Sequence, residues 1–394
     1  MNETSCIYGF DVVEELKGKN VTTSDELAWP CELRIFWVHI LPFVNLVRGL
    51  LSYGTSIIVG VGILLNTVSF VVLTRRNMRK IPSNLYLAAL SIYDTLTLTM
   101  NFMVGVLRGQ NESINKSFQS NEGLCRFHGV IVEMFNLLSV WVIVAFSCER
   151  LFMIKFPLKA RSASPRKALA VVILVSGILF TIALNKVAVS GFEDDSVFGY
   201  KACKTRREIV KEIIYFYVAL NTWIPTLLIV VINTIIICEV KKHKSMRQSL
   251  TNSYMSRTDE KATKILLLVS TTYVLLVLPL GIVQTTELIW NSTKPFIPGE
   301  KGYEGFMLTK IKLKWTRAFF FFFYQFHYAI NFFLYVASSS AHRFRQTLKK
   351  LLGIKTNPED LMTNQASGRN VIVPARSAPA TSDTQGNDSN QSQL

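Results

Sequence analysis

The chain lacks the short motifs that identify most enzymes. Its 394 residues contain no H-E-x-x-H, no G-x-S-x-G, no phosphate-binding P-loop and no cysteine and histidine spacing typical of a metal site. The two halves of the chain show no internal similarity, so the inverted repeats of many transporters are also missing. The sequence therefore predicts neither an enzyme nor a transporter or channel.

Acidic residues are scarce as well. The 43 lysines and arginines outnumber the 27 aspartates and glutamates, which gives a formal net charge of +16, while 49% of the residues are hydrophobic. A strongly basic protein could bind nucleic acid. Here, however, the basic residues lie in short clusters between long apolar runs, as in a membrane protein with basic inner loops. We therefore expect contact with a lipid bilayer and no nucleic acid.

The first thirty residues lack the apolar core of a signal peptide. They are polar and acid-rich, so we expect residues 1–48 to form an extracellular tail and the first apolar run to direct insertion. Cys6 and Cys31 in this tail could form a disulfide with each other or stay unpaired, and the sequence leaves both possibilities open.

Seven long apolar runs follow the tail. Each is near or above the roughly 20 residues that a helix needs to cross a bilayer. A segment surrounded by lipid must be helical, because its backbone groups have no water to bond. The sequence therefore predicts an all-α membrane protein, a seven-transmembrane helix bundle within residues 49–340. The seven runs are roughly 49–74, 84–108, 123–152, 167–190, 210–240, 262–290 and 313–336.

The segments between the runs predict the orientation. Those after the first and third runs contain several lysines and arginines and no acid, and the segment after the fifth run is also basic. Such loops face the cytoplasm, which places the N-terminus outside and the C-terminus inside. Five glycosylation sequons agree, because all fall on the side predicted to be extracellular. They begin at Asn2, Asn20, Asn111, Asn115 and Asn291.

The segment after the seventh run has two parts. Residues 341–352 place apolar side chains on one face and most of their basic residues on the other, which predicts a short amphipathic helix on the inner leaflet. Residues 353–394 are rich in polar residues and proline and predict a disordered cytoplasmic tail. The end, Ser392 to Leu394, resembles a ligand for a PDZ-domain groove.

The third run contains the strongest functional signal. As one helix, Cys125 to Arg150 rises about 37 Å, enough to cross the roughly 30 Å hydrocarbon core. Cys125 then lies at one water interface and the Glu149–Arg150 pair at the other. A charge deeper in the bilayer costs several kcal/mol, so a charged pair at this depth indicates a functional position.

Residues at defined positions of the seven runs form a characteristic set. They are Asn66, Leu90 to Asp94, Cys125, Glu149 to Leu151, Cys203, Pro225, Pro279 and Asn331 to Tyr335. This set, in this order, resembles the rhodopsin-like (class A) G-protein-coupled receptors over about residues 50–352. Within that family the chain is most similar to invertebrate FMRFamide-type neuropeptide receptors, through the phrases CERLFMIKFPLKA and INFFLY and through Val277 to Pro279.

The resemblance implies a plasma-membrane receptor. It would bind an extracellular neuropeptide and signal through a heterotrimeric G protein, with arrestin as a further partner. A chemosensory or small-molecule-activated receptor shares the same fold and is the alternative. The resemblance also implies a disulfide between Cys125 and Cys203.

The resemblance further assigns Glu149, Arg150, Asp259 and Tyr335 to G-protein coupling. Arg150 is expected to pair with Glu149 and Asp259 at rest and to be released on activation. The alternative is that Arg150 only anchors the helix by extending its charged group to the water interface.

A second implied group lies near mid-membrane and consists of Asn66, Asp94, Ser139 and Asn331. In the family these positions hold a sodium ion. The alternative is a protonated, hydrogen-bonded Asp94, and His327 stands nearby in place of the usual asparagine. Four further departures from the family pattern put the standard activation relay in doubt, namely Asn233, Tyr273, Val277 and Phe332.

Polar residues in the outer halves of three runs predict a ligand pocket. They are Glu133, Asn136, Gln284, Glu287, Tyr324 and Gln325. An acid within the membrane is a functional candidate by default, so Glu133 could receive an arginine or amine of a peptide. A local ion pair with Lys186 is an equally weighted alternative. Cys148 and Cys238 are expected to be buried thiols.

Overall fold

The protein is described from a computed structural model. The description covers residues 31–107, 111–156, 164–194, 201–205, 210–249, 257–292, 301–337 and 342–353. The sequons at Asn2 and Asn20, the thiol of Cys6 and the C-terminal Ser392 to Leu394 lie outside the described residues, as do the side chains of Cys31, Cys203 and Asp259.

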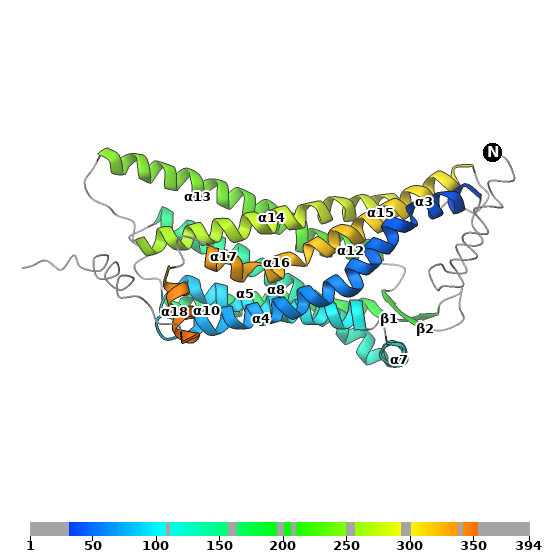
Figure 1. Cartoon of the computed structure of the whole chain (residues 1–394), viewed down its shortest axis with the longest axis horizontal. Helices are drawn as coiled ribbons and strands as arrows, with labels where there is room; N and C mark the ends of the chain where they lie inside the picture. The colour runs from blue at the N-terminus through cyan, green and yellow to red at the C-terminus, as the bar shows by residue number, and fades with distance from the viewer. Residues whose placement is uncertain are drawn as a thin grey trace, which may run out of the picture. The chain divides into compact units, whose positions relative to one another are not determined.

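Six of the described helical segments are long and apolar enough to cross a membrane (Figure 1). Several begin at residues that favour a helix start: Pro82 and Pro165 occupy the first turn of their helices, and Asn121 caps another through its side chain. The elements are α4 (Thr55–Thr74), α5 (Pro82–Asn101) with η2 (Phe102–Leu107), α8 (Glu122–Lys155), α10 (Pro165–Ala183), α12 (Val210–Val218) with η4 (Ala219–Trp223) and α13 (Ile224–Ser249), and α14 (Arg257–Ser292).

The first helix begins well before the predicted boundary at residue 49. A helix α3 (Cys31–Gly49) runs through the π-helical turn η1 (Leu50–Gly54) into α4, so the helical structure continues across that boundary. One face of α3 is apolar and packs against the start of α15 (Tyr303–Tyr324), with Leu33, Trp37 and Ile311 buried between them. The two segments lie side by side in Figure 1.

The seventh segment is helical but interrupted. It comprises α15, α16 (Phe326–Ala329) and α17 (Asn331–Ala337), with breaks at Gln325 and Ile330. These breaks form without a proline, because side chains hydrogen-bond to the backbone carbonyls there. His327 Nδ1 lies 2.6 Å from the Tyr324 carbonyl, Asn66 donates to the Tyr328 carbonyl at 2.8 Å, and Asn331 donates to the His327 carbonyl at 3.3 Å.

The break thus precedes Phe332, the residue that replaces the family's proline. The sequence predicts an unkinked helix at Phe332 itself, since phenylalanine keeps its N–H. The irregularity lies two and seven residues earlier, where asparagine and histidine side chains compete for carbonyl oxygens.

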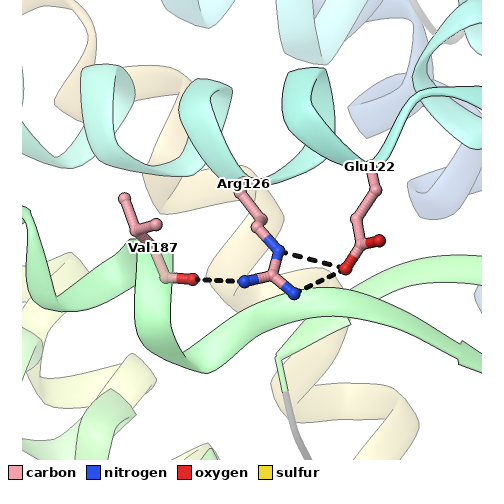
Figure 2. A network of polar contacts seen from close by, with 3 residues as sticks. All are labelled: Glu122, Arg126 and Val187. Atoms are coloured by element: carbon pink, nitrogen blue, oxygen red, sulfur yellow. Dashed lines mark hydrogen bonds and ion pairs between the residues drawn. The ribbon is translucent and has the colours of Figure 1, made fainter.

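The third span is fixed at its start by Arg126. Its guanidinium bonds Glu122 Oε1 at 2.5 and 3.1 Å and donates to the Val187 carbonyl at 3.3 Å (Figure 2). This joins α8 to the short helix α11 (Asn185–Val189). A hairpin follows, with β1 (Ser190–Asp194) antiparallel to β2 (Lys201–Thr205), which the sequence did not predict.

The largest cluster of buried apolar side chains lies in the half of the bundle that contains Arg150. Phe344 of α18 (His342–Leu351) belongs to it, with its ring centroid 5.7 Å from that of Tyr335 and 6.1 Å from that of Phe332. The helix α18 corresponds to the amphipathic segment predicted at 341–352. The prediction of buried thiols was wrong, because Cys148 and Cys238 both lie exposed on the bundle surface, where spanning helices present apolar residues to lipid.

Candidate functional site

Arg150 lies almost fully buried near the end of α8, with 2% of its surface exposed. Its Nη2 and Nε atoms lie 3.0 and 3.3 Å from Glu149 Oε2, and its guanidinium carbon lies 5.5 Å from the centre of the Phe146 ring. A guanidinium that merely anchors a helix keeps its charge in water. The burial of Arg150 therefore argues for a structural or functional partner rather than simple anchoring.

Tyr335, the other candidate for G-protein coupling, is 1% exposed. Its hydroxyl is buried and has no hydrogen-bond partner among the described residues. Burying a hydroxyl without a partner costs about 1–3 kcal/mol. Such a group is expected to gain a partner in another arrangement of the helices, as a switch residue would. Asp259 belongs to α14, and its pairing with Arg150 stays a prediction.

Asp94 is fully buried in α5 and joins three helices. Ser139 of α8 donates to its Oδ1 at 2.5 Å, and Asn331 of α17 donates to its Oδ2 at 2.7 Å. Asn66 of α4 does not contact the carboxyl group in the same way; its amide donates to the Tyr328 carbonyl at 2.8 Å. The predicted group therefore lies at one level, with Asn66 bonding the backbone of the seventh segment.

A sodium ion at this group stays a prediction. A hard cation prefers several oxygen ligands, and each oxygen of Asp94 accepts one protein hydrogen bond and keeps a further lone pair. Nearby, His327 is 4% exposed and offers a ring nitrogen. No group of three or more histidine, cysteine, aspartate or glutamate side chains suited to a metal occurs in the described part of the chain.

Glu133 is held by two neighbouring helices. Asn221 of η4 donates to its Oε1, and Lys186 Nζ lies 3.5 Å from its Oε2. The Lys186 ammonium also lies 4.2 Å from the centre of the Tyr217 ring. The Lys186 side chain is 17% exposed and the Glu133 side chain is 14% exposed. Of the two alternatives for Glu133, the structure contains the ion pair with Lys186.

The other pocket candidates form separate contacts. Asn136 accepts from the Tyr328 hydroxyl at 3.2 Å, and that hydroxyl lies 2.6 Å from the Tyr324 hydroxyl, so Asn136 and Tyr324 belong to one chain of bonds. Glu287 pairs with Arg317 of α15. Gln284 is partly buried.

Gln325 does not join the other candidates. It is fully buried, and its amide donates to Thr55 Oγ1 of the first helix at 3.1 Å. The six residues therefore do not form one continuous surface. Three ion-paired or hydrogen-bonded groups, around Glu133, Asn136 and Glu287, line the same end of the bundle.

The fifth span contains a π-helical turn, η4, directly before Pro225. The Ile224 N–H bonds to the Ala219 carbonyl, five residues back. Proline has no N–H, so Pro225 can donate neither to the carbonyl of Asn221 nor to that of Leu220. The carbonyls of Leu220 and Asn221 can therefore accept from other donors, and backbone groups away from water are almost always paired in native structures.

Side chains from two other spans supply those donors. Trp141 Nε1 of α8 donates to the Leu220 carbonyl at 3.1 Å, and the Tyr273 hydroxyl of α14 donates to the Asn221 carbonyl at 3.2 Å. The Tyr273 ring also packs edge-on against His327, with centroids 5.6 Å apart. Tyr273, one of the departures from the family pattern, thus joins the sixth span to the fifth and the seventh.

We expect Tyr273→Phe to lower the thermal unfolding midpoint of the detergent-purified protein. The ring keeps its packing, but the Asn221 carbonyl loses its donor, which costs about 1 kcal/mol. Tyr53→Phe removes the same hydroxyl from a side chain that is 75% exposed and serves as the matched control. Equal unfolding midpoints for the two variants would contradict the assigned role.

Two predicted extracellular features are only partly described. Cys125 is disulfide-bonded and buried, and Cys203 lies in β2 opposite Phe192, but their pairing stays a prediction. Asn111 is exposed and caps α7 (Glu112–Ser120) through its side-chain oxygen, and Asn291 is exposed near the end of α14. Asn115 is partly buried.

The sequence reasoning did not single out Arg317, Asn221 or Tyr328 as site residues. Arg317 had a usable signal, because a charged residue at membrane depth is a functional candidate by default. Asn221 lies four residues before a proline in a spanning helix, where backbone groups need extra partners. Tyr328 carries no comparable signal in the sequence.

Comparison with known proteins gives a family match. The family described as "7 transmembrane receptor (rhodopsin family)" matches residues 66–335. A protein of Mizuhopecten yessoensis named "Rhodopsin, GQ-coupled" is 24% identical over 249 residues, covering 61% of this chain and 48% of that protein. The "Neuromedin-U receptor 1" of Rattus norvegicus is 31% identical over 125 residues, covering 31% of this chain and 29% of that receptor. The matched segments thus span less than half the length of each relative.

Proposed function

Because the chain belongs to the rhodopsin family of seven-transmembrane receptors, we propose that it is a plasma-membrane receptor for an extracellular neuropeptide that signals through a heterotrimeric G protein. The family is not an enzyme family. The N-terminal tail would lie outside the cell and the C-terminal tail, with arrestin and PDZ-domain proteins as further partners, inside. The proposal that carries most weight for signalling rests on the buried Arg150–Glu149 pair.

We infer that Arg150 is the group that a bound G protein contacts. At rest it is bonded to Glu149 and packed on Phe146. Movement of the sixth helix, which contains Asp259, would separate these contacts and open a groove for a helix of the G protein. Tyr335, whose buried hydroxyl needs a donor or acceptor, is placed to enter that rearrangement.

Three observations support a peptide as the ligand. The polar groups around Glu133, Asn136 and Glu287 come from the third, fifth, sixth and seventh segments, a wide arrangement for a small molecule. One relative is named as a receptor for neuromedin-U. The phrase CERLFMIKFPLKA resembles FMRFamide-type neuropeptide receptors. Ligand binding would shift the population of helix arrangements, and the G protein would bind the shifted state.

The test is a calcium and cyclic-AMP assay in transfected cells against a library of amidated neuropeptides. Calcium is the first readout because one relative is named as Gq-coupled. A potent, saturable response to a peptide supports the proposal. Silence across the library, with the receptor at the cell surface, would favour the alternative of a chemosensory or small-molecule-activated receptor.

A further inference from the structure

The first and seventh segments extend far beyond the thickness of a bilayer. From Cys31 to Thr74 the helix measures about 66 Å, whereas the hydrocarbon core is about 30 Å thick. The α3 part packs along the start of α15, where the Trp37 and Trp315 ring centroids lie 6.3 Å apart. With the predicted orientation, this pair of helices rises above the outer membrane surface.

The tip of this pair carries two acids, and the region below it is basic. Glu304 and Glu32 share a hydrogen bond, which raises the pKa of the Glu304 carboxyl above its usual value. One turn and more below, α15 carries Lys310, Lys314 and Arg317. Arg317 lies at membrane depth, whereas Lys310 and Lys314 lie above it, and cations outside the membrane run against the positive-inside rule, so insertion does not explain the two lysines.

The three cations form a stripe along one face of α15. Residues spaced by three and four lie above one another on a helix, which places Lys310, Lys314 and Arg317 in line. Lys310 and Lys314 are exposed. Lys312 lies on another face, with its ammonium 5.2 Å from the centre of the Phe36 ring of α3. The Lys314 ammonium lies 5.8 Å from the centre of the Trp315 ring, and Lys312 and the stripe occupy different faces of α15.

The lower end of the stripe lies next to the pocket candidates, whose acidic side chains are already paired with cations of the chain. Arg317, at its lower end, pairs with Glu287, and Glu133 pairs with Lys186. Both pocket acids among the described residues are thus neutralised by cations of the chain itself. Lys310 and Lys314 have no ion pair with any described residue. The positive charge left over at this end of the receptor is available to a partner.

We propose that Lys310 and Lys314 of this stripe bind acidic side chains of the extracellular peptide ligand. This inference rests on the proposed peptide-receptor function and narrows it to peptides that carry glutamate or aspartate beside the segment that enters the pocket. Exposed cations above a pocket attract an anionic ligand over a Debye length and raise its association rate. The exposed lysines favour ligands with acidic side chains. Arg317, on the same face, connects this site to the sixth helix through its ion pair with Glu287.

The test compares two fluorescein-labelled peptides on the purified full-length receptor, Glu-Glu-Phe-Met-Arg-Phe-amide and Gln-Gln-Phe-Met-Arg-Phe-amide. At low salt we expect the glutamate peptide to bind about five-fold more tightly, since two exposed ion pairs contribute modestly. The preference should fall close to one in the double variant Lys310→Gln/Lys314→Gln and in high salt. Lys312→Gln removes the same charge from another face of α15 and should keep the preference.

The thermal unfolding midpoint of every variant is measured in parallel, so that loss of folding is not mistaken for loss of binding. Equal binding of the two peptides, or binding of neither, overturns the inference. A preference that appears only after deletion of residues 2–30 overturns it as well, because the chain's own acid-rich segment then covers the stripe. A receptor that responds to a peptide without acids retains the proposed function but not this inference, whereas silence to the whole neuropeptide library removes both.

Discussion

Replacing Arg150 with alanine is expected to abolish G-protein signalling while the amount of receptor at the cell surface stays nearly normal. The guanidinium is 2% exposed and bonded to Glu149, so it is positioned for an interaction that depends on helix arrangement. Alanine fits the helix without strain and removes the charge that the G protein would meet. Basal and peptide-stimulated calcium and cyclic-AMP signals, normalised to surface receptor, measure the effect.

Lys155→Ala is the matched control for this prediction. Lys155 lies on the same helix, five residues later, and is exposed. If the cations at this end of α8 serve only to anchor the helix by the positive-inside rule, the two substitutions should behave alike. If Arg150 acts in coupling, only Arg150→Ala silences the receptor. Full signalling by Arg150→Ala would remove the role assigned to this residue.

The sequence predicts most of the membrane-spanning helices because lipid leaves few alternatives. A run of about 20 apolar residues must be a helix there. That rule predicts seven spans, and six helices of the described residues are long and apolar enough to cross a membrane. The predicted boundary missed the outer extension of the first helix, although residues 35–47 are almost all apolar and the buried side chains recur at helical spacing, at Leu33, Trp37, Leu41 and Val44. This spacing is that of an amphipathic helix, so a search for helical periodicity would have found it.

The local irregularities were harder to foresee. Pro225 indicates that the backbone hydrogen bonds of the fifth span are interrupted, because proline has no N–H to donate. Nothing in the sequence says that Trp141 and Tyr273 supply the replacement donors, because this depends on how the third and sixth helices are rotated. In the same way, the break in the seventh segment depends on which carbonyls Asn66 and His327 reach, and those contacts join residues more than 200 positions apart in one case.

Charge partners within the membrane follow the same logic. That Glu133 needs a partner follows from the cost of a lone charge in lipid, and the sequence offers Lys186 or a ligand with equal weight. The ion pair forms because the end of the fourth helix places Lys186 Nζ 3.5 Å from the Glu133 carboxylate. The packing of α15 against α14 brings Arg317 and Glu287 together as an ion pair.

The second large effect is expected for Lys186→Met, which should lower stability and surface expression. Methionine keeps the apolar stem that packs near Tyr217 but removes the charge. Glu133 is then left as a mostly buried carboxylate with Asn221 as its main partner. Loss of one partner of a buried pair is strongly destabilising, and with both side chains slightly exposed we expect about 2 kcal/mol. Thermal unfolding of the purified receptor measures the effect.

The double variant Glu133→Gln/Lys186→Met separates the ion pair from simple packing. Removing both charges leaves no uncompensated group, so the double variant should recover most of the stability lost by Lys186→Met. Arg317→Gln, at the second ion pair, is the matched control, and its effect should be smaller because the Arg317 side chain is 40% exposed. Equal stability of the single and double variants would show that the Glu133–Lys186 pair contributes nothing.

The same variant also decides how Glu133 meets a ligand. In the unmodified receptor, an arginine of a peptide can reach Glu133 only by displacing Lys186, so part of its binding energy is spent on separating that pair. In Lys186→Met the carboxylate is unpaired, and an arginine-bearing peptide that uses it should gain affinity despite the lower stability of the receptor. If affinity is unchanged when binding is corrected for folded receptor, Glu133 and Lys186 tie the third helix to the fourth and do not contact the peptide.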